Sequence, residues 1–231
     1  MAESVRRRLS QGQNRKKGIE KWGNVCYNDY KCYRKAVNCV AVFVEAKDLV
    51  VDRERTCCFT GHRNRDLPFH GDLSTQGMRN LLSIVHFHII EAYEAGSRNF
   101  MTGMAEGVDL LCGSVMFDVM NDKRYPDIKL YCVLPYAEQR RELNSVKERY
   151  IHSLMMQCAE AVVVTGNACD KGRYRVRNQF MVDHSSRMIA VYKEKPTGSG
   201  TLQTINMAKR AGLDMHIIRL DERDNSHFYL E

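Results

Sequence analysis

The sequence predicts an α/β fold: a Rossmann-like, doubly wound and mostly parallel sheet in three layers, preceded by a basic N-terminal extension. From residue 56 onward, short apolar runs alternate with longer segments that have helical periodicity. Each short run is apolar on both alternating faces, which is typical of a strand buried on both sides of a parallel sheet. The longer segments carry apolar residues at steps of three and four, which form one face of a helix. A regular alternation of such strands and helices is typical of an α/β fold.

Six strands and five helices follow from these patterns. The predicted strands are Cys57–Thr60, Asn99–Thr102, Lys129–Leu134, Ala161–Thr165, Met188–Tyr192 and His216–Leu220. The predicted helices lie between them, at Ser74–Ala95, Gly107–Met120, Ala137–Ala159, Tyr174–Arg187 and Thr201–Ala211. Gly96 and Gly212 directly follow the first and the last of these helices, where a glycine commonly ends a helix.

The 231-residue chain divides into a basic beginning and an almost neutral remainder. Residues 1–55 contain 13 Lys and Arg against 7 Asp and Glu, whereas the remainder contains 22 against 21. We therefore expect a basic extension over residues 1–55 and a ligand-binding domain over residues 56–231. Because this domain has almost no net charge, its attraction for an anionic ligand must come from local loops and helix ends.

The basic extension leaves two interpretations open. Residues 1–24 are polar and basic, which predicts a solvated tail, although such an arm also suits single-stranded nucleic acid. Residues 25–50 interleave tyrosines with Lys and Arg, which suits either stacking on nucleic-acid bases or a short helix packed on the domain. We favour packing for this second segment.

Composition argues against a membrane protein and against a metal centre. No apolar run reaches the roughly 18 residues that span a bilayer, and no secretory signal is recognisable, so we expect a cytoplasmic protein with free thiols. The cysteines number nine, and some lie inside apolar runs, where Cys acts as a small hydrophobe. Cys26, Cys32 and Cys39 could suggest a metal site, but no C-x-x-C pair supports one. Neither a metal nor a cofactor is predicted.

Glycine and polar residues follow the predicted strands. Ligands of open α/β sheets bind beyond the carboxyl ends of the strands, so these positions are candidates for ligand contacts. The candidate ligand-binding residues are Thr60, Gly61, His62, Arg63, Gly103, Met104, Ala105, Gly107, Asp109, Pro135, Arg177, Asn178, Gly198, Ser199, Gly200 and Thr201.

Two of these segments are glycine-containing loops that enter helices. Glycine lets the backbone approach a ligand closely, and a helix N-terminus presents free N–H groups and partial positive charge to an anion. The loop at Gly198–Thr201 adds two hydroxyl groups, which suits a phosphate. Neither the Walker pattern nor G-x-G-x-x-G is present, which disfavours a P-loop NTPase or an ordinary dehydrogenase.

Several polar side chains among these candidates have two possible roles. Arg63 suits a phosphate, or else a surface pair with Asp66. Asp109 suits a ribose hydroxyl, or else stabilises the helix dipole from the first turn. His62 follows a strand end and could act as an acid or base. The candidate catalytic groups are His62, Glu106 and Asp109.

Four segments occur in a characteristic order along residues 56–220: Cys57–Arg63, Phe100–Asp109, Arg177–Asp183 and Gly198–Thr201. Together they resemble the SLOG superfamily, the Rossmann-like fold shared by DprA and the LOG phosphoribohydrolases, and in particular its YpsA-like branch. The resemblance implies a nucleotide or nucleotide-derived ligand, such as an ADP-ribose-like or NAD-derived molecule. It also implies that the two glycine-containing loops and the turn after the first strand hold this ligand.

The resemblance departs from the catalytic LOG pattern at one position. Catalytic LOG enzymes carry P-G-G-x-G-T-x-x-E, whose Glu acts on the N-glycosidic bond. The matching stretch here begins at Pro196 and keeps Gly200 and Thr201, but Thr204 stands where the Glu would be. A hydroxyl cannot replace that carboxylate in acid–base work. This departure favours a binding module over a hydrolase.

Three functions fit these features of the sequence. The favoured one is sensing or sequestering of a nucleotide-derived small molecule. The second is hydrolysis of a nucleotide N-glycosidic bond by another acidic group, and the third is DprA-like binding of single-stranded nucleic acid through the basic N-terminus. A homodimer is compatible with each of them, because sheets of this class often pair through their helices.

Overall fold

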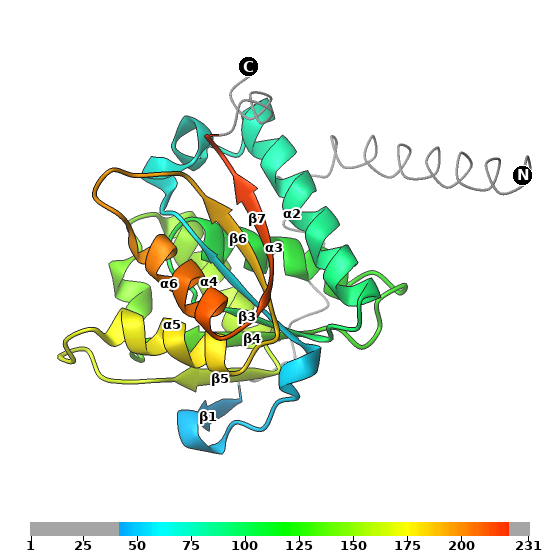
Figure 1. The fold of residues 1–231 in the computed structure, drawn as a ribbon, viewed down its shortest axis with the longest axis vertical. Coiled ribbons are helices and arrows are strands. Elements are labelled where there is room, and N and C mark those ends of the chain that lie inside the picture. Colours follow the sequence, from blue (N-terminus) through cyan, green and yellow to red (C-terminus); the bar gives the residue numbers. More distant parts are fainter. Residues whose placement is uncertain (1–41, 222–231) are drawn as a thin grey trace, which may run out of the picture. The chain divides into compact units, whose positions relative to one another are not determined.

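A computed structural model of the chain describes residues 42–221 (Figure 1). Seven strands form one sheet in the order β1-β5-β4-β3-β2-β6-β7, and every neighbouring pair is parallel. The strands are β1 (Phe43–Glu45), β2 (Thr56–Gly61), β3 (Asn99–Thr102), β4 (Lys129–Leu134), β5 (Ala161–Val164), β6 (Arg187–Tyr192) and β7 (Asp214–Arg219).

Helices cover both faces of the sheet and complete three layers (Figure 1). One face is covered by α5 and α6, whose apolar residues pack with Met101, Val163 and Ala190 of the sheet. The opposite face is covered by α2, α3 and α4. The helices are α2 (Gln76–Glu94), α3 (Val108–Met120), α4 (Val146–Cys158), α5 (Arg173–Asp183) and α6 (Gly200–Arg210). The predicted fold class is confirmed.

The path of the chain creates a crevice in this sheet. From β2 the chain proceeds through β3, β4 and β5 toward one edge, and then returns to place β6 on the other side of β2. Connections from β2 and from β6 therefore leave the sheet in opposite directions. A crevice opens at the carboxyl ends of two such strands, and ligands of open α/β sheets bind there.

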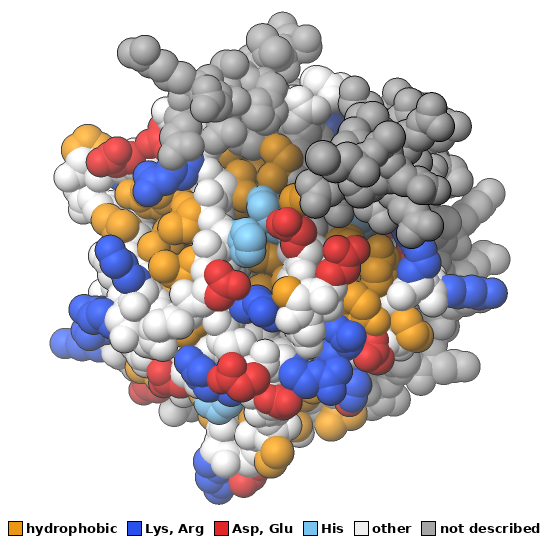
Figure 2. Space-filling model, turned by 45° about the vertical axis from the view of Figure 1, so that its right-hand side comes forward, with side chains coloured by type: hydrophobic (Ala, Val, Ile, Leu, Met, Phe, Trp, Pro, Cys, Tyr) orange, Lys and Arg blue, Asp and Glu red, His pale blue; other side chains and the backbone are white. Residues whose placement is uncertain are grey.

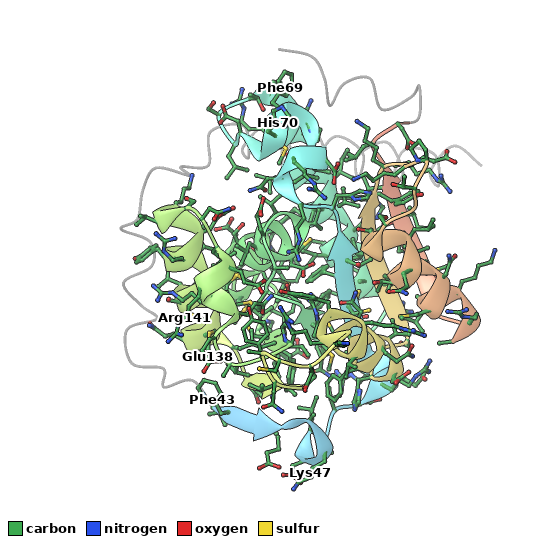
Figure 3. All side chains as sticks on the ribbon, turned by 90° about the vertical axis from the view of Figure 1, so that its left-hand side faces the viewer. Phe43, Lys47, Phe69, His70, Glu138 and Arg141 are labelled. Atoms are coloured by element: carbon green, nitrogen blue, oxygen red, sulfur yellow. The ribbon has the colours of Figure 1, made fainter. Side chains whose placement is uncertain are left out.

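The sheet includes one strand that the sequence patterns did not predict. Residues 43–45, inside the segment assigned to the N-terminal extension, form β1 and pair with β5 through Phe43 opposite Val162. A short helix was expected over residues 25–50. Its first part lies outside the described residues, and Phe43–Glu45 is extended because its backbone completes the β5 edge. Figure 3 shows Phe43 and Lys47 at this end of the domain.

The long helix predicted over Ala137–Ala159 is wrong in its first third. The 3-10 turn η6 (Gln139–Glu142) comes first, and α4 begins only at Val146. Ser145 and Glu148 form a capping box that satisfies the first free N–H groups of α4. The sequence contains this signal as the spacing S-x-x-E from Ser145 to Glu148. Figure 3 labels Glu138, directly before η6, and Arg141, which belongs to η6.

The helix predicted at Tyr174–Arg187 ends four residues early, at Asp183. The Ser186 N–H donates to the carbonyl of Thr56 at 3.0 Å, which starts the pairing of β6 with β2. Arg187 therefore opens a strand instead of closing a helix. No helix within residues 42–221 is long and apolar enough to cross a membrane.

The centre of the sheet is fully buried and contains free thiols. Cys57, Cys58, Cys112 and Cys132 are buried and unbridged, so they fill the core as small hydrophobes, as expected for those in the apolar runs. Burial raises the pKa of Cys58 to about 12, which keeps this thiol protonated and unreactive at neutral pH.

His152 of α4 makes the stability of the domain depend on pH. The ring is fully buried, neither ring nitrogen has a hydrogen-bond partner among the described residues, and burial lowers its pKa to about 4. The unfolded chain takes up the proton near pH 6.5, whereas the folded chain does not. We therefore expect His152 to remove up to about 3 kcal/mol of unfolding free energy as the pH falls from about 6.5 to 4.

Urea denaturation of the wild type and of His152→Leu across this pH range measures the effect. The variant should lose less stability on acidification and should equal or exceed the wild type at low pH. Equal slopes in the two proteins would contradict a buried neutral imidazole at this position.

Candidate functional site

A cavity of about 350 Å³ lies at the carboxyl ends of β2 and β6. It occupies the crevice that the chain path creates. The predicted ligand-binding residues that line it are Thr60, Gly61, His62, Arg63, Ala105, Asp109, Arg177, Asn178, Gly198, Ser199, Gly200 and Thr201. Residues far apart in the sequence thus come together at one sheet edge.

The first turn of α6 forms one wall of this cavity. Ser199 caps the helix by accepting the Leu202 N–H at 3.1 Å. The N–H groups of Gly200 and Thr201 belong to the same turn, where backbone donors have no acceptor within the helix. Gly198 adopts a φ of +70°, which turns the chain into the helix, and a side chain placed on Gly200 would meet open space. This turn therefore offers backbone N–H groups that the helix itself leaves unpaired, and Gly200 adds no side chain in front of them.

A buried ion pair forms the floor of the cavity. Arg177 Nη1 of α5 lies 3.0 Å from Asp109 Oδ2 of α3, and both side chains are at least nine-tenths buried. The same Asp109 oxygen accepts the Ala105 N–H at 3.3 Å. Burial lowers the pKa of Arg177, while the Asp109 charge opposes this, and a guanidinium stays protonated at neutral pH. The ion pair thus connects α3 and α5, which lie on opposite faces of the sheet.

Gly103 is required by this ion pair. A Cβ on Gly103 would lie 0.9 Å from Arg177 Nη1, so only glycine leaves room for the guanidinium. Gly103, Met104 and Gly107 do not line the cavity. Met104 is fully buried and holds a φ of +60°, a conformation that costs about 1–3 kcal/mol in a residue other than glycine.

The N-terminus of α3 is closed by the protein itself. The Val108 N–H donates to the carbonyl of His62 at 3.1 Å, and Gly107 packs against the same carbonyl with a φ of +87°. A Cβ on Gly61 would collide with Val108. Of the two glycine-containing loops, the one entering α3 therefore holds two protein segments together, and the one entering α6 faces the cavity.

His62 joins the ends of the two strands that flank the crevice. Its Nε2 lies 2.9 Å from the Lys193 carbonyl just after β6, and a carbonyl only accepts, so this nitrogen carries the proton. Nδ1 lies 3.5 Å from Thr201 Oγ1 and 3.8 Å from Asp66 Oδ2. Burial lowers the pKa of His62, with the Lys193 hydrogen bond opposing it. In this arrangement the ring of His62 connects the end of β2 to the backbone just after β6.

Asp66 pairs with a different cation from the one that the sequence suggested. Its two oxygens accept hydrogen bonds from Lys195 Nζ, each at 2.9 Å, whereas Arg63 Nη1 donates to the Glu106 carbonyl at 3.2 Å. Burial alone would raise the pKa of Asp66, but the Lys195 bonds lower it below its usual value. The Glu106 side chain and Pro135 are not among the lining groups.

Some residues that line the cavity were not predicted from the sequence, and their charged side chains change the net charge of the cavity. The missed residues are Arg65, Asp66, Tyr174, Met181, Lys195 and Thr197. Lys195 and Thr197 come just before the predicted phosphate loop, Gly198–Thr201, in the chain. This position was the sequence signal that could have identified them. With them, the charged side chains of the lining are Arg63, Arg65, Arg177 and Lys195 against Asp66 and Asp109, a formal excess of two positive charges.

Residues 57–223 match the model of the YspA SLOG family (YpsA). The chain belongs to this SLOG family. It is 25% identical over 154 residues to a UPF0398 protein of Bacillus cereus, which covers 66% of this chain and 77% of the relative. It is 27% identical over 124 residues to a UPF0398 protein of Bacillus thuringiensis (strain Al Hakam), which covers 53% of this chain and 61% of the relative.

Among solved structures, this SLOG chain is similar to DNA processing protein A from Helicobacter pylori, which was described for its single-stranded DNA binding mode. The TM-score is 0.49 at 14% sequence identity, over 76% of this chain and 71% of that one.

Thr204 of this SLOG domain lies behind the cavity and not in it. Its hydroxyl donates to the Gly200 carbonyl at 2.9 Å and accepts from Asn178 Nδ2 at 2.7 Å. The side chain is fully buried and is not part of the lining. At the position where the LOG pattern has its Glu, this chain therefore has a hydroxyl that joins α6 to α5.

Proposed function

We propose that this SLOG domain binds a nucleotide or nucleotide-derived ligand and places one of its phosphates at the first turn of α6. The observation that carries the proposal is an open helix N-terminus that faces a cavity with an excess of positive charge. Backbone N–H groups and the helix dipole favour an anion there, and arginines nearby add bidentate donors. The volume lies in the lower part of the range of small-molecule sites.

The geometry supports binding over hydrolysis. Among the described residues that line the cavity, Asp66 and Asp109 are the carboxylates, and each is held by a cation. A carboxylate that acts as a base or stabilises a developing sugar cation must be available to the substrate. Asp109 would have to leave Arg177 to do so. Sensing or sequestering of the ligand is thus the function that fits these contacts.

Gly200→Trp should weaken ligand binding strongly and leave the fold intact. The new side chain would start in open space, so no protein atom has to move, but it would project from the wall that receives the phosphate. Calorimetric titration with AMP, ADP, ADP-ribose, NAD and inorganic phosphate should find at least one binder of the wild type. Its Kd should rise by about tenfold or more in the variant, which corresponds to about 1.4 kcal/mol.

Val50→Trp is the matched control, because Val50 is 94% exposed and does not line the cavity. It should bind as the wild type does. Binding of a nucleotide with equal affinity to the wild type and Gly200→Trp would contradict the proposed site. Release of a free base from AMP would instead favour the hydrolase alternative.

A single-stranded oligonucleotide belongs in the same titration, because the basic arm that suggested nucleic acid lies in residues 1–24, outside the described residues. Affinity for it that is lost on deletion of residues 1–24 but kept in Gly200→Trp would assign nucleic-acid binding to the arm. The homodimer, the cytoplasmic location and the boundary at residue 56 also stay predictions. Sedimentation of the full chain with and without ligand tests the first of these.

A further inference from the structure

A second group of ligand-type side chains lies on α2 and the edge strand β7. His88 and Glu91 stand one helical turn apart on α2, and His216 comes from the middle of β7. One potential ligand atom from each residue lies within 4.8 Å of the others. None of the three lines the cavity of the proposed nucleotide site. On the face shown in Figure 2, histidine side chains lie at the surface beside acidic ones.

The packing of this group places two imidazoles against each other. The rings of His88 and His216 have centroids 4.9 Å apart and are tilted by 34°. His88 Nδ1 lies 2.9 Å from Glu91 Oε2, so the carboxylate orients this ring. All three side chains are partly buried, which limits the number of orientations that they can adopt. No local sequence pattern reveals this group, because His216 lies more than 120 residues after His88 and Glu91 in the chain.

The chemistry of the group suits a divalent cation. Two imidazoles and one carboxylate, all common metal ligands, each offer an atom within 4.8 Å of the others. Imidazole nitrogens are preferred by borderline metals such as Zn²⁺, Co²⁺ and Ni²⁺, whereas Mg²⁺ and Ca²⁺ prefer oxygen ligands. Two histidines and one carboxylate, from three side chains, form a known type of zinc ligand set that leaves a position for water.

We propose that His88, Glu91 and His216 bind one divalent transition metal ion of the zinc class, which would join α2 to the edge strand β7. The helix supplies two ligands in one turn and thus fixes their spacing, while β7 supplies the third. Within residues 42–221, the edge strand β7 pairs with β6 alone. A metal ion at this site would add a second attachment between β7 and the rest of the domain. The expected consequence is a more stable attachment of β7 to the domain.

Stoichiometry of Zn²⁺ binding to the metal-free full chain tests this site. Calorimetry should show that His216→Ala binds one Zn²⁺ fewer than the wild type, whatever the cysteines bind. His70→Ala is the matched control, because His70 is exposed in the turn η5 (Pro68–Gly71) at the opposite end of the domain from β1 (Figure 3). It should bind as many ions as the wild type.

Co²⁺ gives a second readout that separates this site from thiolates. A site of two imidazoles and a carboxylate should give visible ligand-field bands without a sulfur-to-cobalt charge-transfer band in the near ultraviolet. These bands should vanish in His216→Ala and weaken in Glu91→Gln, which keeps the shape of the side chain. Circular dichroism of the metal-free variants establishes that they are folded.

Equal Zn²⁺ stoichiometry in the wild type and His216→Ala would overturn the proposal. So would Co²⁺ spectra that contain only thiolate bands. A rise in melting temperature on addition of Zn²⁺ that is the same in both proteins would also contradict it, because the joining of α2 to β7 requires His216.

Discussion

Arg177→Met is expected to lower the free energy of unfolding by about 3–5 kcal/mol. Methionine fills much of the space of the arginine, but it leaves the Asp109 carboxylate buried without its cation. The cost of an unpaired buried charge exceeds the small gain that the original pair provided over apolar packing. Urea denaturation at pH 7, followed by circular dichroism, measures the difference.

Two further variants separate the unpaired charge from a general loss of packing. The double variant Arg177→Met with Asp109→Leu should recover most of the lost stability, because no charge is then left unpaired. Lys129→Met breaks an exposed ion pair of 2.6 Å with Glu160 and should cost about 0–1 kcal/mol. If the double variant were as unstable as the single one, the ion pair would not be the cause.

Gly107→Ala is expected to have an effect of similar size through the backbone. Gly107 has a φ of +87°, which costs a residue with a Cβ about 1–3 kcal/mol. The added Cβ would also lie 2.3 Å from the His62 carbonyl oxygen, which is backbone and cannot rotate away. Forcing these segments apart adds about 1–3 kcal/mol, and it breaks the bond from the Val108 N–H to that carbonyl.

Gly172→Ala is the control for a positive φ without the contact, since Gly172 has a φ of +74° in the left-handed helical region and nothing within 4 Å of its Cβ position. Gly107 has a ψ of −131°, outside that region, so its variant adds backbone strain as well as the contact with the end of β2. Equal losses of stability in both variants would mean that neither of these contributes.

Gly107→Ala should also weaken ligand binding, because the His62 carbonyl anchors the end of β2 beneath the cavity. Gly172→Ala should leave binding unchanged. Calorimetry with whichever nucleotide binds the wild type compares the two variants under conditions in which both are folded.

Local patterns in the sequence determined the layered α/β fold, the six predicted strands and the positions of the turns that follow them. They did so because the period of apolar residues depends on secondary structure and burial, which a single segment expresses by itself. The same patterns placed the helix entrance at Gly198–Thr201 at the edge of the sheet where the cavity lies. β1 escaped prediction because three residues are too short for a period, and pairing with β5 alone makes them a strand.

Contacts between distant segments were decided only by the tertiary structure. Gly103 and Gly200 look alike in the sequence, yet one makes room for Arg177 and the other faces open space. Asp66 has Arg63 as a neighbour in the sequence but bonds to Lys195 across the crevice. His88 and His216 meet only because α2 lies over β7. A residue type fixes which contacts are chemically possible, whereas the path of the chain selects the partner that completes each one.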